Sequence, residues 1–203
     1  MPDIELKLLT RGGVLMIPIF LCSIMGLAMI FNRALTYWRM QLRGFTLPSS
    51  VRRAIEKEDF DAALNAVDKE TAGSSIIRET IIHSREQGIR TVFNSFLIVA
   101  DGFIRRMERY LRGLATIATV SPLLGLLGTV IGMIKSFIQI EIHGGSVNAS
   151  LLAGGIWEAL LTTAAGLAVA IPCILFYNIF QGRVEWVESQ LTNLSKEFKD
   201  AAS

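Results

Sequence analysis

The sequence predicts an all-α membrane protein with three transmembrane helices, long cytoplasmic helical extensions and a cytoplasmic helical hairpin. Three observations predict this class. Of the 203 residues, 51% are apolar and 19% are charged, and the mean hydropathy is +0.46. A soluble domain of this size disperses its apolar residues among charged ones, whereas here they gather in three long uncharged runs. The basic residues concentrate between the first two runs.

The overall charge and the cysteine content exclude several classes of protein. The 20 Lys and Arg residues are balanced by 18 Asp and Glu, and the net charge of +2 gives no electrostatic footprint for a nucleic acid. Cys22 and Cys173 both lie inside uncharged runs. We expect them to pack as small apolar residues and to form neither a disulfide nor a metal site. Composition therefore excludes a secreted disulfide scaffold, a disordered tail and a nucleic-acid binder.

The uncharged runs cover residues 13–31, 113–134 and 159–182, and they are 19, 22 and 24 residues long. About 20 helical residues cross the ~30 Å hydrocarbon core of a bilayer, so each run predicts a transmembrane helix. A cleaved signal peptide is the competing interpretation of the first run. We reject it because the apolar stretch is too long and its positive flank follows the run instead of preceding it.

The distribution of basic residues predicts the orientation. Fourteen Lys and Arg residues lie within 32–112, whereas Lys7 and Arg11 precede the first run and Lys135 alone follows the second. The side richer in Lys and Arg is the cytoplasmic one. The predicted cytoplasmic segments are therefore 32–112 and 183–203, and the predicted outer segments are 1–12 and 135–158.

The first cytoplasmic segment predicts a helical hairpin. Residues 51–68 carry apolar side chains at helical spacing with charges opposite, and Ser50 before them is a suitable N-cap. We expect Ala72-Gly73-Ser74 to break the chain. Residues 75–86 then form a second helix that ends at Gly88.

Two long extensions are expected to continue the spans into the cytoplasm. No strong helix breaker separates Thr91 from Pro122, so one continuous helix should lead into the second span. The tail over 181–199 is amphipathic and should continue the third span. The polar side of the first extension carries a cytoplasmic basic face, formed by Arg105, Arg106, Arg109 and Arg112. We interpret this face first as the solvated side of a stabilising bundle, with a regulatory docking site, anionic headgroups or a lumenal anion as alternatives.

No enzyme motif occurs in the sequence, and no cofactor is expected. Instead, small and polar residues recur at spacings of three and four within two of the runs. The second run carries Ser121, Gly125, Gly128, Thr129 and Gly132. The third carries Thr162, Gly166 and Ala170, with Thr163 beside them, and Glu158 directly before the run continues the same spacing. These two stripes face either each other or a common partner.

The stripes have two interpretations. Small residues let helices pack closely, and this interpretation is favoured for the glycines. For Thr129 and Thr163, packing and an ion path remain equally open. Pro122 and Pro172 lie inside spans, where a proline kinks the helix and exposes a carbonyl group.

Glu158 is the ionisable residue at the start of the third run. A carboxyl group at membrane depth costs several kcal/mol unless it is hydrated or paired, and such groups mark ion pathways. The alternative is a carboxylate at headgroup level, which the dipole of a helix N-terminus favours.

Both stripes resemble one membrane protein family. The segment from Ser121 to Phe137 is similar to the Pro-x-x-Gly-Leu-x-Gly-Thr-Val-x-Gly-Met pattern of the ExbB/TolQ/MotA proton-channel family. Glu158-Ala-Leu, Thr162-Thr163, Gly166-Leu, Ala170-Ile-Pro172 and Tyr177-Asn178 resemble its last span. MotA has four spans and a larger cytoplasmic loop, so three spans favour an ExbB- or TolQ-like subunit.

The resemblance implies a homopentamer in the bacterial inner membrane, with the second and third spans around a central pore. The pore would hold the helices of an ExbD- or TolR-like partner, a single-span protein with one membrane Asp. A periplasm-spanning protein like TonB or TolA is a further implied partner, and membrane lipids surround the ring. By resemblance, the pore threonines are Thr129 and Thr163, and Glu158 is the conserved third-span glutamate. We expect Thr162, next to Thr163, to belong to the same proton pathway.

The residues agree with half of an ion-driven machine. At mid-membrane depth the chain carries hydroxyl groups and no carboxyl group, so a partner must supply the titrating site. We expect a subunit that converts proton-motive force into work on the cell envelope, such as TonB-dependent outer-membrane transport. The alternatives are a passive scaffold that recruits partners through its cytoplasmic helices and a Na⁺-driven stator.

Overall fold

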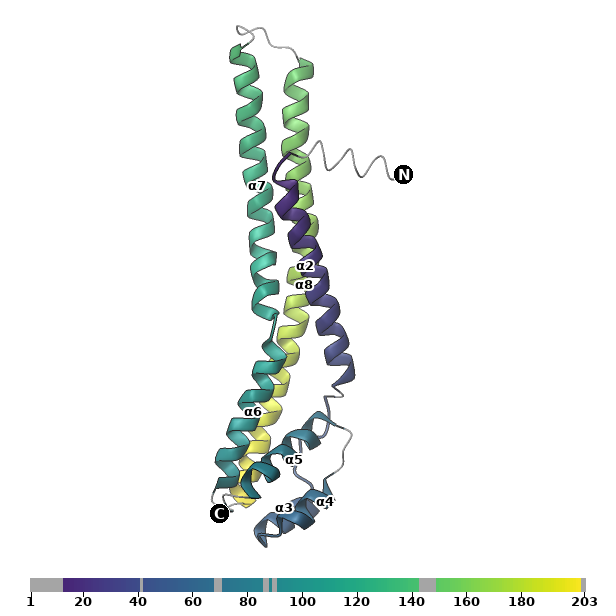
Figure 1. Ribbon diagram of the computed structural model, residues 1–203, viewed down its shortest axis with the longest axis vertical. Helices are drawn as coiled ribbons and strands as arrows, with labels where there is room; N and C mark the ends of the chain where they lie inside the picture. Colours follow the sequence, from purple (N-terminus) through teal and green to yellow (C-terminus); the bar gives the residue numbers. More distant parts are fainter. Residues whose placement is uncertain are drawn as a thin grey trace. The chain divides into compact units, whose positions relative to one another are not determined.

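The computed structural model describes residues 13–40, 42–67, 71–85, 88, 91–142 and 149–201. The described residues form helices and no strand, which confirms the all-α fold (Figure 1). The helices are α2 (Met16–Arg39), α3 (Ser49–Glu56), α4 (Phe60–Ala66), α5 (Ala72–Arg85), α6 (Val92–Glu108), α7 (Leu111–Ile142) and α8 (Ala149–Ala201).

Three described stretches are long and apolar enough to cross a membrane. They are Met16–Arg39, Val92–Ile142 and Ala153–Ala201. The first contains all but residues 13–15 of the first uncharged run, and the other two contain the second and third runs completely. The helices continue beyond the runs, since α7 ends only at Ile142 and α8 begins at Ala149.

The chain forms two compact units. The first combines Met1–Phe31 with Tyr110–Asn178, and it contains the three uncharged runs apart from the last turn of the third. The second combines Asn32–Arg109 with Ile179–Ser203, and it contains most of the charged residues. Helices α2 and α8 are each divided between the units, with one end in the first unit and the other end in the second.

In the first unit, α7 runs beside the N-terminal half of α8 (Figure 1). Helix α2 joins them at Gly26, where an added Cβ atom would lie 2.7 Å from Cys173 Sγ and 3.6 Å from Ile117 Cγ2. Cys173 is buried, Cys22 is half-buried, and both thiols are free. The two cysteines form no disulfide with each other.

Large side chains build the core of the second unit. Phe96 of α6 stacks on Phe198 of α8 with ring centroids 4.9 Å apart. Phe45 meets Trp186 edge to face at 5.8 Å. The fully buried aliphatic side chains of this unit include Val51, Ile55, Ile76, Ile77, Ile81, Val92, Met107, Val184 and Leu194. Burial of this much large apolar surface is typical of a core that folds against water.

The helix predicted over residues 51–68 is two helices, α3 and α4. Glu58 between them has φ +57°, a left-handed conformation that ends the first helix. Asp59 then caps the second, since its Oδ1 accepts from Ala62 N at 2.9 Å. The prediction was wrong because an aspartate that caps a new helix outweighed the continuous apolar spacing.

The predicted break at Ala72-Gly73-Ser74 is instead the first turn of α5. Thr71 caps this turn, because its Oγ1 accepts from Ser74 N at 3.2 Å. Gly73 is needed for close approach: its N–H donates to Arg43 O at 3.0 Å, and a Cβ atom there would collide with the Gly44 carbonyl group. The glycine therefore serves contact between segments and does not end the helix.

The continuous helix expected from Thr91 is broken at Arg109 and Tyr110, between α6 and α7. Tyr110 has φ +71°, a conformation that costs a non-glycine residue free energy. The open end of α6 is satisfied by side chains of α2. Arg33 Nη1 donates to Arg106 O at 3.0 Å and to Met107 O at 3.4 Å, and Tyr37 Oη donates to Met107 O at 2.8 Å.

The expected continuation of the third span is confirmed. Helix α8 runs without interruption from Ala149 to Ala201, and it passes through Pro172. Its buried side chains in the second unit recur at Val184, Val187, Leu191, Leu194 and Phe198, which is the predicted amphipathic face.

Candidate functional site

The two stripes of small residues face each other across α7 and α8. A Cβ atom added to Gly125 would lie 2.9 Å from Thr163 Cα and 3.0 Å from Thr162 O. One added to Gly128 would collide with the side chain of Thr162. The backbones therefore approach so closely that only glycine fits these positions of α7.

The same close packing continues at both ends of the stripes. A Cβ atom on Gly132 would lie 2.9 Å from Ala159 Cβ and from Gly155 O. From the other helix, a Cβ atom on Gly166 would lie 2.5 Å from Ser121 O. The four glycines therefore lie at the contact between α7 and α8, and the two stripes face each other there.

Thr163 links the two helices by a polar contact. Its Oγ1 donates to Gly125 O at 2.9 Å, across 38 residues of sequence, and the side chain is half-buried. A hydroxyl group that donates one hydrogen bond still has lone pairs that accept others. Thr163 therefore links α7 to α8 and also presents a hydrogen-bond acceptor in the first unit.

Thr129 lies one turn along α7 from Gly125, the residue that Thr163 contacts. Its Oγ1 donates to Leu126 O of its own helix at 2.6 Å. Thr162, by contrast, is only 1% exposed, and its Oγ1 donates to Ala159 O at 2.8 Å. Thr129 and Thr163 thus retain partial exposure, whereas Thr162 is enclosed between α7 and α8.

Glu158 is paired with Lys135. Lys135 Nζ lies 2.6 Å from Glu158 Oε1, and the side chains are 50% and 22% exposed respectively. A cavity of about 220 Å³ opens beside the pair, and Gly128, Ile131 and Thr162 also line it. The carboxylate therefore has a cationic partner and an opening toward the buried part of the glycine stripe.

The partner of Glu158 was not predicted. Lys135 follows Gly132 by three residues, so it extends the α7 stripe by one turn toward Glu158. That spacing is the signal that would have found it. Gly13 packs directly against the Glu158 carboxylate. It has φ +70°, and a Cβ atom there would collide with that carboxylate.

Pro122 and Pro172 lie inside α7 and α8, and both helices continue through them. Ser121, next to the first proline, is fully buried, and its hydroxyl group has no hydrogen-bond partner among the described residues. Pro122 removes one backbone N–H donor from the helix. At this point of α7, Pro122 thus lacks a backbone N–H donor, and the neighbouring Ser121 hydroxyl group has no hydrogen-bond partner among the described residues.

The basic face predicted on one helix is divided by the break at Tyr110. Arg105 and Arg106 lie on α6, where they pair with Asp101 at 2.8 Å and Glu79 at 3.6 Å. Arg109 lies at the break, and Arg112 is exposed in the first turn of α7. The four arginines therefore do not lie on one uninterrupted helix, because α6 ends at Glu108.

Comparison with known proteins gives the chain's relatives. The sequence model described as the MotA/TolQ/ExbB proton channel family matches residues 48–193. An ExbB-like biopolymer transport protein of Synechocystis is 33% identical over 186 residues, covering 83% of this chain and 67% of that protein. The biopolymer transport protein ExbB of Pseudomonas putida is 30% identical over 190 residues, covering 85% of this chain and 56% of that protein.

A TolQ relative matches a shorter stretch. The Tol-Pal system protein TolQ of Haemophilus influenzae is 41% identical over 97 residues, which cover 47% of this chain and 41% of that protein. The family match includes the facing stripes of α7 and α8. Together with the three apolar stretches, it identifies a multi-pass membrane protein. On these grounds, the chain belongs to the MotA/TolQ/ExbB proton channel family.

Proposed function

We propose that the chain is the channel subunit of a proton-driven motor in the bacterial inner membrane. It assembles as a homopentamer around an ExbD- or TolR-like partner that carries one Asp in its single span. Proton flow through this complex performs work on the cell envelope, through a TonB- or TolA-like protein that spans the periplasm. Residues 1–12 and 135–158 are periplasmic in this proposal, and 32–112 and 183–203 are cytoplasmic.

One observation carries the proposal: the second and third uncharged runs of this chain, which bear the two stripes, contain hydroxyl groups and no carboxyl group. Between residues 113–134 and within 159–182 there is no Asp or Glu. A hydroxyl group passes a hydrogen bond along but does not hold a titrating proton near neutral pH. The titrating group must therefore come from another chain, with Thr129 and Thr163 as relays and Glu158 at the outer mouth.

The proposal is tested by proton flux in liposomes. We expect the purified chain alone to be silent and the chain co-reconstituted with its single-span partner to conduct. Thr129→Val and Thr163→Val should each lower that flux roughly tenfold or more, since a positioned proton-transfer group is lost. Equal flux from the chain alone would contradict the need for a partner.

Thr116→Val is the matched control. Thr116 also lies on α7, and its Oγ1 donates to its own helix, to Arg112 O at 2.9 Å. Its position is about 140° around the helix from Thr129. The control variant should conduct like the wild type, so a loss of flux confined to Thr129 and Thr163 assigns the path.

A passive scaffold is the second candidate, and the Thr163 bond to Gly125 O favours it. In a scaffold that bond only holds α7 against α8. Thr163→Ser then separates the two functions, because serine keeps the hydroxyl group. A relay restores flux with Ser, whereas a scaffold assembles normally and shows no flux in any variant. Replacement of all Na⁺ by K⁺ distinguishes the third candidate, a Na⁺-driven stator, which would lose activity.

A further inference from the structure

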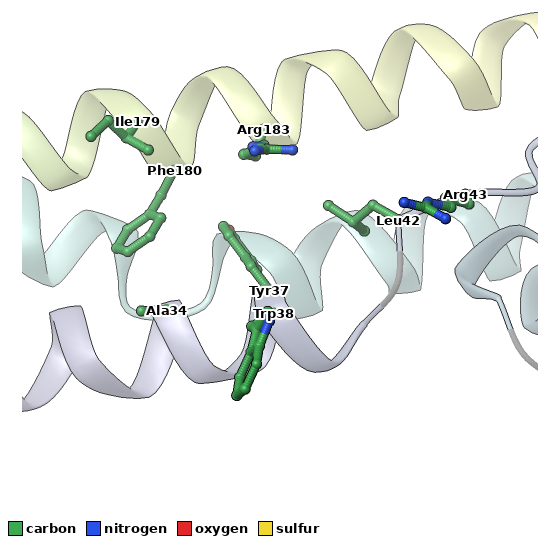
Figure 2. Close-up of a pocket in the computed structure, with 8 residues that line it drawn as sticks. All are labelled: Ala34, Tyr37, Trp38, Leu42, Arg43, Ile179, Phe180 and Arg183. Carbon is green, nitrogen blue, oxygen red and sulfur yellow. The ribbon is translucent and has the colours of Figure 1, made fainter.

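The second unit contains a cavity of about 680 Å³ between the end of α2 and α8. Figure 2 shows Tyr37 and Phe180 pointing into the space between the two helices, with Arg183 on α8 and Arg43 on the segment after α2. Tyr37 and Phe180 pack edge to face, with centroids 5.3 Å apart. The Tyr37 hydroxyl group is bonded to Met107 O, so this aromatic wall is fixed in place.

The charge of the cavity is uncompensated within the described residues. Arg43 and Arg183 both line it and both are exposed. Neither guanidinium group forms an ion pair with a described carboxylate, and none of the lining residues is acidic. Two unpaired arginines in one cavity form a donor set that suits a phosphate group, which accepts forked hydrogen bonds.

The position of the cavity along the chain indicates where the phosphate would come from. Its α2 residues begin at Ala34, three positions after the uncharged run that ends at Phe31. Its α8 residues, Ile179 to Arg183, overlap the end of the third run at Gly182. Trp38 beside the cavity is 83% exposed, as aromatic residues at a membrane surface are. Two spans therefore reach the bilayer surface at this cavity.

We propose that this cavity binds the headgroup of an anionic glycerophospholipid. The lipid phosphate lies between Arg43 and Arg183, and its acyl chains run along the apolar side chains of Ile179 and Phe180 toward the bilayer. The site is separate from the threonines and from Glu158, and it goes beyond proton conduction. It gives the motor subunit a fixed lipid at the point where its spans leave the membrane.

The test is native mass spectrometry of the full chain in detergent with dioleoyl phosphatidylglycerol or dioleoyl phosphatidylcholine. The wild type should retain the anionic lipid in preference to the zwitterionic one. In the double variant Arg43→Gln/Arg183→Gln this preference should fall about 30-fold, because each basic residue near an anionic surface contributes roughly a factor of five. Arg53→Gln, an exposed arginine of α3 outside the cavity, should keep it.

The conservative double variant Arg43→Lys/Arg183→Lys keeps both charges, and it should retain most of the preference even if the Gln pair disturbs folding. A wild type that shows no preference for the anionic lipid would overturn the proposal. A Gln double variant that keeps the preference, or a Lys double variant that loses it, would overturn it as well. Inorganic phosphate at millimolar concentration is the last arm. If phosphate abolishes the preference for the anionic lipid entirely, the cavity binds free phosphate, and the proposal that it binds a lipid headgroup is wrong. Because no flux is measured, these outcomes are independent of proton conduction.

Discussion

The contact between α7 and α8 in the first unit depends on the smallest residues, whereas the core of the second unit depends on large ones. Gly125, Gly128 and Gly166 bring the first pair of helices into backbone contact, whereas Phe96 and Phe198 fill the second unit with large rings. In water, burial of large apolar side chains stabilises a core. In lipid, an apolar side chain gains little by moving from acyl chains into protein, so close backbone packing and polar contacts must hold the helices.

The largest expected effect is in the second unit. Phe198→Ala removes a fully buried ring that stacks on Phe96, and it should lower the free energy of unfolding by about 3–5 kcal/mol. Phe31→Ala is the matched change in the first unit, where the ring is 67% exposed. Denaturant titration in mild detergent should show a much smaller shift for Phe31. Equal shifts would mean that both units depend on large side chains.

The second effect tests a polar contact in the unit that is otherwise held by apolar packing. Arg33 is 4% exposed and donates to two carbonyl groups at the end of α6. Arg33→Leu should cost about 1.5–3 kcal/mol, the range for lost hydrogen bonds to a charged group. Hydrogen exchange at the end of α6 should also become faster. Arg39→Leu, an exposed arginine of the same helix, is the control and should leave exchange there unchanged.

The third effect concerns the glycine stripe. Gly128→Ala forces a methyl group against Thr162, and it should destabilise the first unit by about 1–3 kcal/mol. Gly154→Ala is the matched control on α8, because nothing lies within 4 Å of an added Cβ there. The control should be stabilised by about 0.5–1 kcal/mol, since alanine is the better helix former. A stabilising Gly128→Ala would disprove the close packing.

The smallest effect belongs to the pair of Lys135 and Glu158. The lysine side chain is half exposed, so solvent screens the attraction, and the coupling should stay below about 1 kcal/mol. A double-mutant cycle with Lys135→Met and Glu158→Gln measures it. Coupling above about 2 kcal/mol would show that the pair is buried in the assembled protein.

Features that depend on nearby residues were predictable from the sequence. The three uncharged runs are local in sequence. Helices long enough to cross a membrane cover residues 16–31 of the first run and the whole of the other two. The stripe on each helix follows from helical period, because residues three and four apart share a face. That the two stripes face each other is seen only in the structure. The same reasoning selected Thr163 and Glu158 as candidate site residues, since both lie on or beside the third-run stripe.

Features that depend on distant residues were not predictable. The break before Leu111 is stabilised by Arg33 and Tyr37. Arg33 lies 73 positions from its acceptor residue Arg106, and Tyr37 lies 70 positions from its acceptor residue Met107. No glycine or proline marks the break itself, and Tyr110 adopts a left-handed conformation that its residue type disfavours. The pairing of Lys135 with Glu158 likewise joins two helices across 23 residues.

The contact of Arg33 with Arg106 O also orders events during synthesis. The two residues are 73 positions apart. At about 5–20 residues per second, ribosomes need roughly 4–15 s to make that interval. During this time the Arg33 guanidinium group carries its positive charge beside the first apolar run, where basic residues influence the direction of membrane insertion. Only afterwards do the carbonyl groups of α6 emerge and enclose it. One side chain therefore serves first as a topology signal for the nascent chain and then as a cap in the folded protein.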